Sequence, residues 1–262
     1  MELFVEQAGG GAPVVLLHGL TATHRYVVMG SKALERSGHL VIAYDARAHG
    51  RSDPAPDPTA YTYPDLCADL GRVMDERGVQ RAVLAGASMG AHTLLRFALE
   101  HPERVAGLVV ITPAYTPEDF GDERSLRRWD ALADGLRERG VEGFVDAYGD
   151  PGVPEQWREN VLKVIRQRLS AHEHPGALAD AIQAVPRSRP FDALEDLGAI
   201  GAPTVVVADR DEPDPGHPLR VGEAYARAIP GARLVVEEAG RSPIAWQGSQ
   251  LAKVIAEIAD RA

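Results

Sequence analysis

A serine between two glycines is the residue of this sequence best placed to do covalent chemistry. The pentapeptide 86–90 reads Gly-Ala-Ser-Met-Gly, with Ser88 at its centre, after the apolar run 82–85 and before a segment of helical periodicity. A serine on a sharp strand-to-helix turn needs small residues two positions to either side, and such a turn exposes the hydroxyl. The following helix N-terminus favours developing negative charge. The spacing therefore predicts Ser88 as a nucleophile for acyl transfer.

A second segment could stabilise the oxyanion that this chemistry forms. His18-Gly19-Leu20 follows the apolar run 14–17. Gly19 allows the chain to turn tightly. The backbone N–H groups of Leu20 and Met89 are then expected to form a two-donor oxyanion hole. We expect His18 to brace this loop rather than to carry a proton.

These two segments, together with the octapeptide 45–52 (Asp-Ala-Arg-Ala-His-Gly-Arg-Ser), carry a family resemblance. The chain resembles the α/β-hydrolase superfamily, in its capped esterase, lactonase and C–C hydrolase branch. The resemblance runs from residue 14 to the C-terminus, except for a helical insertion. It implies structural roles for Asp45 and Arg47, and usually for His49, and a catalytic acid on the loop after the run 204–208. Asp211 matches that acid, with Asp209 and Asp214 as alternatives in the same loop.

The resemblance also implies a catalytic histidine directly after Gly240, but this sequence has Arg241 there. Arginine stays charged at working pH and has no lone pair to accept a proton. A serine without a base is a poor nucleophile. Arg241 could instead pair with Asp211 or hold a substrate carboxylate.

Three explanations remain open at this point. Another histidine could supply the base: His174 is the first candidate, beside His172 in the inserted segment, then His217 on the acid loop and His24, which is expected to line the pocket. Alternatively, the protein is a lyase or cyclase that uses Arg241 as an anion clamp. As a third explanation, it is a ligand-binding module without catalysis.

The rest of the chain supplies the elements that would position these residues. Short apolar runs are typical of strands buried on both faces of a parallel sheet, and helical segments between them indicate a doubly wound α/β layer. Residues 115–189 show only helical periodicity, expected as four helices. We predict an α/β-hydrolase core of 1–114 and 190–262 with a cap at 115–189. The expected strands are 14–17, 40–44, 82–85, 105–111, 204–208 and 233–236, and the expected core helices are 31–37, 63–76, 89–100, 218–229 and 246–260.

Composition limits the partners. The 262 residues carry a net charge of −10, which argues against nucleic acid. We find no signal peptide and no apolar run of about 18 residues, so a cytoplasmic protein without membrane contact is expected. The single cysteine, Cys67, excludes an intrachain disulfide. No cofactor motif is present, and His172 with His174 lacks a third metal ligand. The expected partner is a small-molecule substrate, and a homodimer is left open.

The sequence therefore predicts a serine-dependent hydrolase of a carboxylic ester or lactone. The expected catalytic residues are Ser88, Asp211 and His174, the last being a non-standard base in the cap. His24 and Arg241 are expected to contact the substrate. The alternative is a non-hydrolytic protein of the same fold, with Arg241 gripping an anionic ligand.

Overall fold

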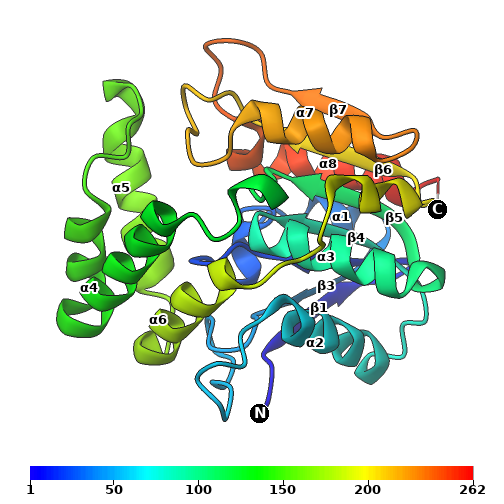
Figure 1. The fold of residues 1–262 in the computed structure, drawn as a ribbon. Coiled ribbons are helices and arrows are strands. Elements are labelled where there is room, and N and C mark those ends of the chain that lie inside the picture. The colour runs from blue at the N-terminus through cyan, green and yellow to red at the C-terminus, as the bar shows by residue number, and fades with distance from the viewer. Residues whose placement is uncertain (262) are drawn as a thin grey trace.

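The computed structural model describes residues 1–261 of the chain and has a seven-stranded sheet at its centre (Figure 1). The strand order is β1-β3-β2-β4-β5-β6-β7, and every pair is parallel except β1 with β3. The strands are β1 (Val5–Gly9), β2 (Ala12–Leu17), β3 (His39–Tyr44), β4 (Ala82–Ala87), β5 (Val105–Ile111), β6 (Thr204–Ala208) and β7 (Arg233–Val236). The predicted, mostly parallel α/β sheet is confirmed.

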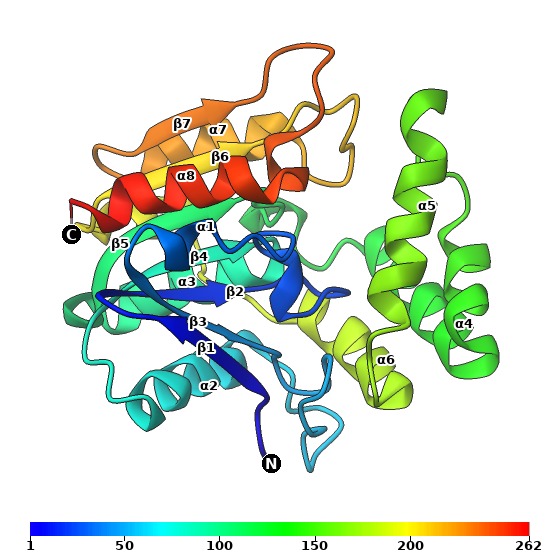
Figure 2. The ribbon, with the colours of Figure 1, turned by 180° about the vertical axis from the view of Figure 1, so that it is seen from behind.

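Helices cover both faces of this sheet. In Figure 1, α2, α3 and α7 lie in front of the strands, and Figure 2 shows α1 and α8 on the opposite face. Each face carries its own apolar layer because the strands are buried on both sides. These helices are α1 (Ala33–Arg36), α2 (Tyr63–Glu76), α3 (Met89–Glu100), α7 (Leu219–Ala228) and α8 (Gly248–Ala259). None of the helices in residues 1–261 has the length and apolarity to cross a membrane.

The chain between β5 and β6 forms three helices that stand to one side of the sheet in both views (Figures 1 and 2). They are α4 (Glu123–Tyr148), α5 (Glu155–Leu169) and α6 (Pro175–Ala184). Two helices were expected where α4 lies, and α4 is indeed interrupted by a kink at Arg139 and Gly140. Gly140 has φ 62°, a value that other residues adopt at a cost, so the glycine explains the break. We call α4, α5 and α6 the cap.

Contacts at both ends of α5 join the cap to the sheet. The backbone N–H of Gly50 donates to His172 Nδ1 at 2.8 Å, and His172 Nε2 donates to Thr21 O at 3.3 Å. At the other end of α5, the Trp157 ring meets the Trp246 ring edge to face at 5.7 Å. These contacts hold the ends of α5 against loops that follow β2, β3 and β7, at the carboxyl edge of the sheet.

Candidate active site

Ser88 occupies a strained turn between β4 and α3. Its φ of 50° and ψ of −111° lie outside the regions that a serine ordinarily adopts. Two backbone hydrogen bonds of 3.0 Å hold it there, from Ser88 N–H to Ile111 O and from His92 N–H to Ser88 O. A Cβ on Gly90 would lie 2.3 Å from Leu17 O, so only glycine allows this close approach. This turn, the elbow expected from the glycine spacing, is therefore present, and close packing against β2 requires the glycine at position 90.

The loop after β2 lies directly against the serine. A Cβ built on Gly19 would be 3.6 Å from Ser88 Cβ. Within residues 1–261, neither the Leu20 N–H nor the Met89 N–H has a hydrogen-bond partner. Unpaired backbone donors of this kind are what a developing oxyanion requires. The role of these two N–H groups as oxyanion donors stays a prediction.

The His18 ring holds this loop through two hydrogen bonds. Its Nδ1 donates to Gly19 O at 2.8 Å, and its Nε2 accepts from Ala46 N–H at 2.9 Å. Burial, helped by the neighbouring His49, lowers the pKa of His18 to about 3. A neutral imidazole with both nitrogens engaged acts as a brace, as the sequence led us to expect.

His24 is held by two acidic side chains, those of Asp45 and Glu6. Its backbone N–H and its Nδ1 both bond to Asp45 Oδ1, at 2.7 and 2.8 Å. Its Nε2 lies 3.3 Å from a carboxylate oxygen of Glu6 on β1. The ring is therefore committed to these two acids, and its contacts do not support the predicted place in the pocket wall.

The acid loop after β6 differs from the expectation. Asp211 is exposed, and its Oδ1 accepts from Leu219 N–H at 2.6 Å at the start of α7. Asp214 instead carries the contact to a histidine, with its oxygens 2.9 and 3.0 Å from His217 Nδ1. Asp209 is fully buried, and burial, followed by Asp214 and a second carboxyl nearby, raises its pKa to about 8. The structure thus pairs Asp214, not Asp211, with an imidazole.

His217 lies among the groups at the carboxyl edge of the sheet. Burial lowers its pKa, but the Asp214 carboxylate outweighs that effect, so the pKa is raised overall. It is close enough to His92 to act on it electrostatically, and His92 lies one turn after Ser88 on α3. Within the described chain, neither the Ser88 hydroxyl nor His217 Nε2 makes a hydrogen bond. Neither atom is therefore engaged by another group of the described chain.

Arg241 lies away from this cluster. Its side chain is 74% exposed, and its only ion pair within residues 1–261 is a 3.4 Å contact from Nε to Glu238. It makes no contact with Asp211, although such a pair was one of its predicted roles. Glu237 does turn inward from the same loop and accepts from the Arg210 backbone N–H. The position of the expected histidine thus faces solvent.

The two cap histidines have different surroundings. His174 stands at the start of α6, half-buried, and its ring makes no hydrogen bond within the described chain. His172 makes the two contacts described above, and burial, followed by His49, lowers its pKa to about 4. His172 is therefore neutral at neutral pH and fastens the cap. Within residues 1–261, neither histidine makes a hydrogen bond to Ser88.

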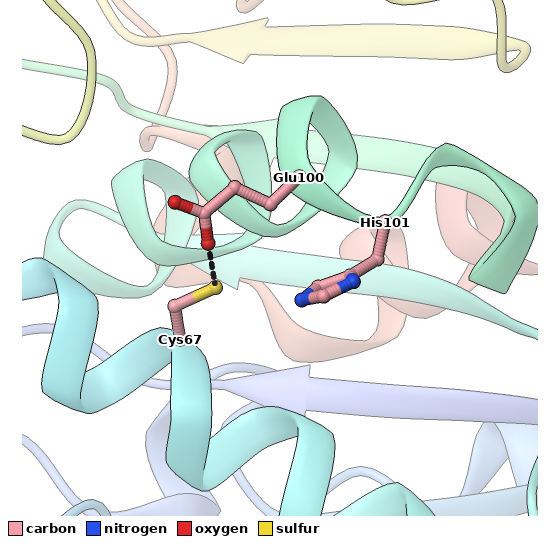
Figure 3. A group of neighbouring side chains, drawn as sticks. All are labelled: Cys67, Glu100 and His101. Atoms are coloured by element: carbon pink, nitrogen blue, oxygen red, sulfur yellow. Dashed lines mark hydrogen bonds between the residues drawn. The ribbon is translucent and has the colours of Figure 1, made fainter.

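One further cluster has metal-ligating side chains. Figure 3 shows Cys67 of α2 beside Glu100 and His101 at the end of α3, with ligand atoms within 4.8 Å of one another. The thiol donates to Glu100 Oε2 at 3.2 Å, burial raises the pKa of Cys67, and Glu100 also pairs with Arg96. A protonated thiol and an ion-paired carboxylate leave only His101 as a free ligand. The cluster lies roughly 18 Å from the serine, the length of α3, so it has no part in this site.

The sequence as a whole can now be compared with known proteins. The family described as alpha/beta hydrolase fold matches residues 12–247. The chain belongs to the α/β-hydrolase family. This match covers most of the chain and includes the elbow, the oxyanion loop and the acid loop.

Individual relatives agree with the family. The chain is 32% identical over 203 residues, 77% of this chain and 74% of the other, to a protein of Variovorax paradoxus (strain S110) named as a candidate carbamate hydrolase, RutD. A thermophilic esterase from Thermogutta terrifontis, with malate bound, is 28% identical with a TM-score of 0.78, and the match covers 99% of this chain and 93% of that one. The enol-lactonase from Burkholderia xenovorans LB400 shares the fold, with 24% identity, a TM-score of 0.75, and coverage of 98% and 95%. The protein is a hydrolase of this family.

Proposed function

We propose that the protein hydrolyses a carboxylic ester or lactone, with Ser88 as nucleophile and His217 as its base. The observation that carries this proposal is the strained serine beside two unpaired amide donors, those of Leu20 and Met89. Backbone strain persists only where surrounding structure enforces it, and it is concentrated at functional sites. The relatives named as esterase and lactonase support the same class of substrate.

The proposed reaction follows from these positions. Ser88 Oγ attacks the carbonyl carbon while its proton passes to His217 Nε2. The carbonyl oxygen takes up the negative charge and accepts hydrogen bonds from Leu20 N–H and Met89 N–H. Collapse breaks the ester C–O bond, and the proton on His217 moves to the departing alkoxide. Water then attacks the acyl-enzyme with the same proton transfers in reverse order, which releases the acid and restores Ser88.

The choice of His217 over His174 rests on its partner. His217 Nδ1 faces Asp214, which leaves Nε2 to accept a proton and stabilises the imidazolium that forms. His174 has no acid that would orient it within the described chain. Neither imidazole is hydrogen-bonded to the Ser88 hydroxyl within residues 1–261, so the base must move toward Ser88 when substrate binds. Such tightening in the complex is common for catalytic hydrogen bonds. The proposal therefore replaces both Asp211 and His174 with the pair Asp214 and His217.

Labelling with a fluorophosphonate, read by intact mass, tests the nucleophile. We expect one adduct per chain within minutes, no adduct in Ser88→Ala, and unchanged labelling in Ser249→Ala, which alters an exposed serine on α8. Turnover is then measured on an ester, a lactone and a carbamate of matched size, since one relative bears the carbamate hydrolase name. If no adduct forms over several hours, Ser88 is not activated, and the non-hydrolytic reading of the same fold takes the place of this proposal.

A further inference from the structure

A half-buried arginine of the cap has no acidic partner within residues 1–261. Arg168 lies in the last turn of α5, and its Nε is closed off from solvent without a hydrogen bond in residues 1–261. No carboxylate lies within 4.0 Å of its guanidinium in the described chain. Arg166, two positions earlier on the same helix, is exposed and grips Glu142 through Nε at 2.9 Å and Nη2 at 3.0 Å. Arg166 is thus paired with a carboxylate, whereas Arg168, whose Nε is buried, is not.

Such an arrangement is costly unless a ligand completes it. A charge removed from water loses solvation free energy, and proteins usually compensate with a counter-ion or full hydrogen bonding. Burial accordingly lowers the pKa of Arg168. Nothing in the described residues provides the missing anion at contact distance. An anion from outside the chain would remove the cost.

The position of Arg168 places that anion close to the reacting groups. Its guanidinium carbon lies 5.1 Å from the centre of the Tyr26 ring, just beyond the oxyanion loop. Its charge also reaches Asp214 and His217, the proposed acid and base. One turn further along the chain, His172 contacts Thr21 O, next to the oxyanion donor Leu20. Arg168 is therefore held over the region in which the proposed chemistry takes place.

We infer that Arg168 binds an ionised carboxyl group of the substrate, which is an ester or lactone that carries a second, free carboxylate. This inference rests on the proposed function and names the substrate class for it. The planar guanidinium offers two parallel N–H donors to a carboxylate, and the Tyr26 ring face steadies its orientation. Asp214 does not fill this role, because its carboxylate faces His217 Nδ1 and makes no ion pair with Arg168 within residues 1–261. A neutral alkyl group would leave the guanidinium as uncompensated as it is without ligand.

Two matched substrates test the inference in the wild-type protein and its variants. Monomethyl adipate carries the free carboxylate and methyl hexanoate lacks it, and hydrolysis of both is followed by proton release. We expect the wild type to prefer the anionic ester in kcat/KM, and Arg168→Gln to reduce that preference by about 10- to 100-fold, as for a charge-assisted pair. Arg168→Lys keeps the charge and should restore part of the preference. Arg166→Gln, on the exposed side of the same helix, should leave the preference unchanged.

A binding measurement separates this inference from the serine mechanism. Calorimetric titration of adipate into Ser88→Ala should give binding that is lost in the double variant Ser88→Ala/Arg168→Gln. The Arg168 side chain makes no ion pair or hydrogen bond within residues 1–261, so Arg168→Gln should stay close to the parent in Tm, and an unchanged Tm excludes misfolding as the cause. Equal binding with and without Arg168, or equal preference for the two esters, would overturn the inference even if Ser88 is labelled. Arg168-dependent binding without labelling would sink the serine mechanism and leave the carboxylate site standing.

Discussion

The carboxyl edge of the sheet has two halves that are built differently. At the elbow, a Cβ on Gly86 would lie 2.5 Å from the Gly90 backbone, and a Cβ on Gly90 would meet Leu17 O. At the loop after β7, Gly240 has open space around it and Arg241 points into solvent. Neighbouring strands leave the elbow no alternative conformation, whereas the loop is constrained by few contacts. The nucleophile can therefore stay in place while the proton-carrying group changes position.

The two halves also differ in charge. The histidines nearest the elbow, His18 and His92, have their pKa lowered to about 3, mainly by burial, so they are neutral at working pH. The other half gathers carboxyl groups, with a buried Asp209 and a buried Glu237 that each have one oxygen without a hydrogen bond. An imidazole that must accept a proton is helped by nearby negative charge, which here comes from the Asp214 carboxylate beside His217, since the raised pKa of Asp209 keeps that carboxyl protonated at neutral pH. This difference favours His217, in the acidic half, as the base.

The largest expected effect comes from removing that base. His217→Ala should lower kcat by about 10²- to 10⁴-fold, the range for loss of a positioned general base. His174→Ala serves as the matched control and should stay close to wild type, because its ring has no acid partner. Steady-state kinetics on one ester decides between them. A large loss for His174→Ala and none for His217→Ala would return the base to the cap, as the sequence first suggested.

The pH profile sharpens the same test. Asp214 raises the pKa of His217, and a base must be deprotonated to work, so kcat/KM should rise with pH through that raised pKa. Asp214→Asn removes the raising effect and should move the acidic limb of the profile to lower pH. A profile that does not move when Asp214 is changed would mean that another group sets it.

A smaller effect is expected in stability, from Asp209. Its folded pKa of about 8 lies above the unfolded value, so between about pH 4 and pH 8 the folded state holds a proton that the unfolded state has released. The free energy of unfolding therefore falls as pH rises through this window, by up to about 1.4 kcal/mol per pH unit. Asp209→Asn should remove this slope, so its advantage over wild type grows from pH 5 to pH 8.

Urea unfolding at several pH values measures that slope. Asp211→Asn is the matched control, since this aspartate lies on the same loop but is exposed. It should follow the wild-type dependence. If Asp209→Asn keeps the wild-type slope, the buried carboxyl is ionised in the folded protein and burial does not raise its pKa.

The sequence predicted the elements that burial dictates. All six apolar runs became strands, because a strand covered on both faces must be apolar throughout. The elbow was also predictable, since the turn at Ser88 admits only small neighbours. In contrast, the strand Val5–Gly9 gave only a weak alternating pattern, and its antiparallel pairing with β3 could not be read from spacing.

The polar half of the site was less predictable, because loop residues are positioned by contacts that spacing does not encode. The resemblance pointed to Asp211, which instead accepts a hydrogen bond at the start of α7. Asp214 and His217 lie three residues apart on that loop, a signal that was available but weak. Arg168 had no signal at all, since an arginine on a polar helix usually faces solvent. Only the packing of the cap reveals that its Nε is buried without a hydrogen bond.

The smallest expected effect concerns the position where the resemblance implies a histidine. Arg241→His restores that residue. The Arg241 side chain that it replaces is 74% exposed and points toward Glu238, so the new imidazole is expected to face solvent as well. We therefore expect kcat/KM to change by less than about threefold, because an imidazole in solvent cannot share a proton with the serine. The same substitution in a His217→Ala background is the sharper form of the test. If it restores activity there, the loop after β7 can close on Ser88, and the two halves of the site are less different than their structures indicate.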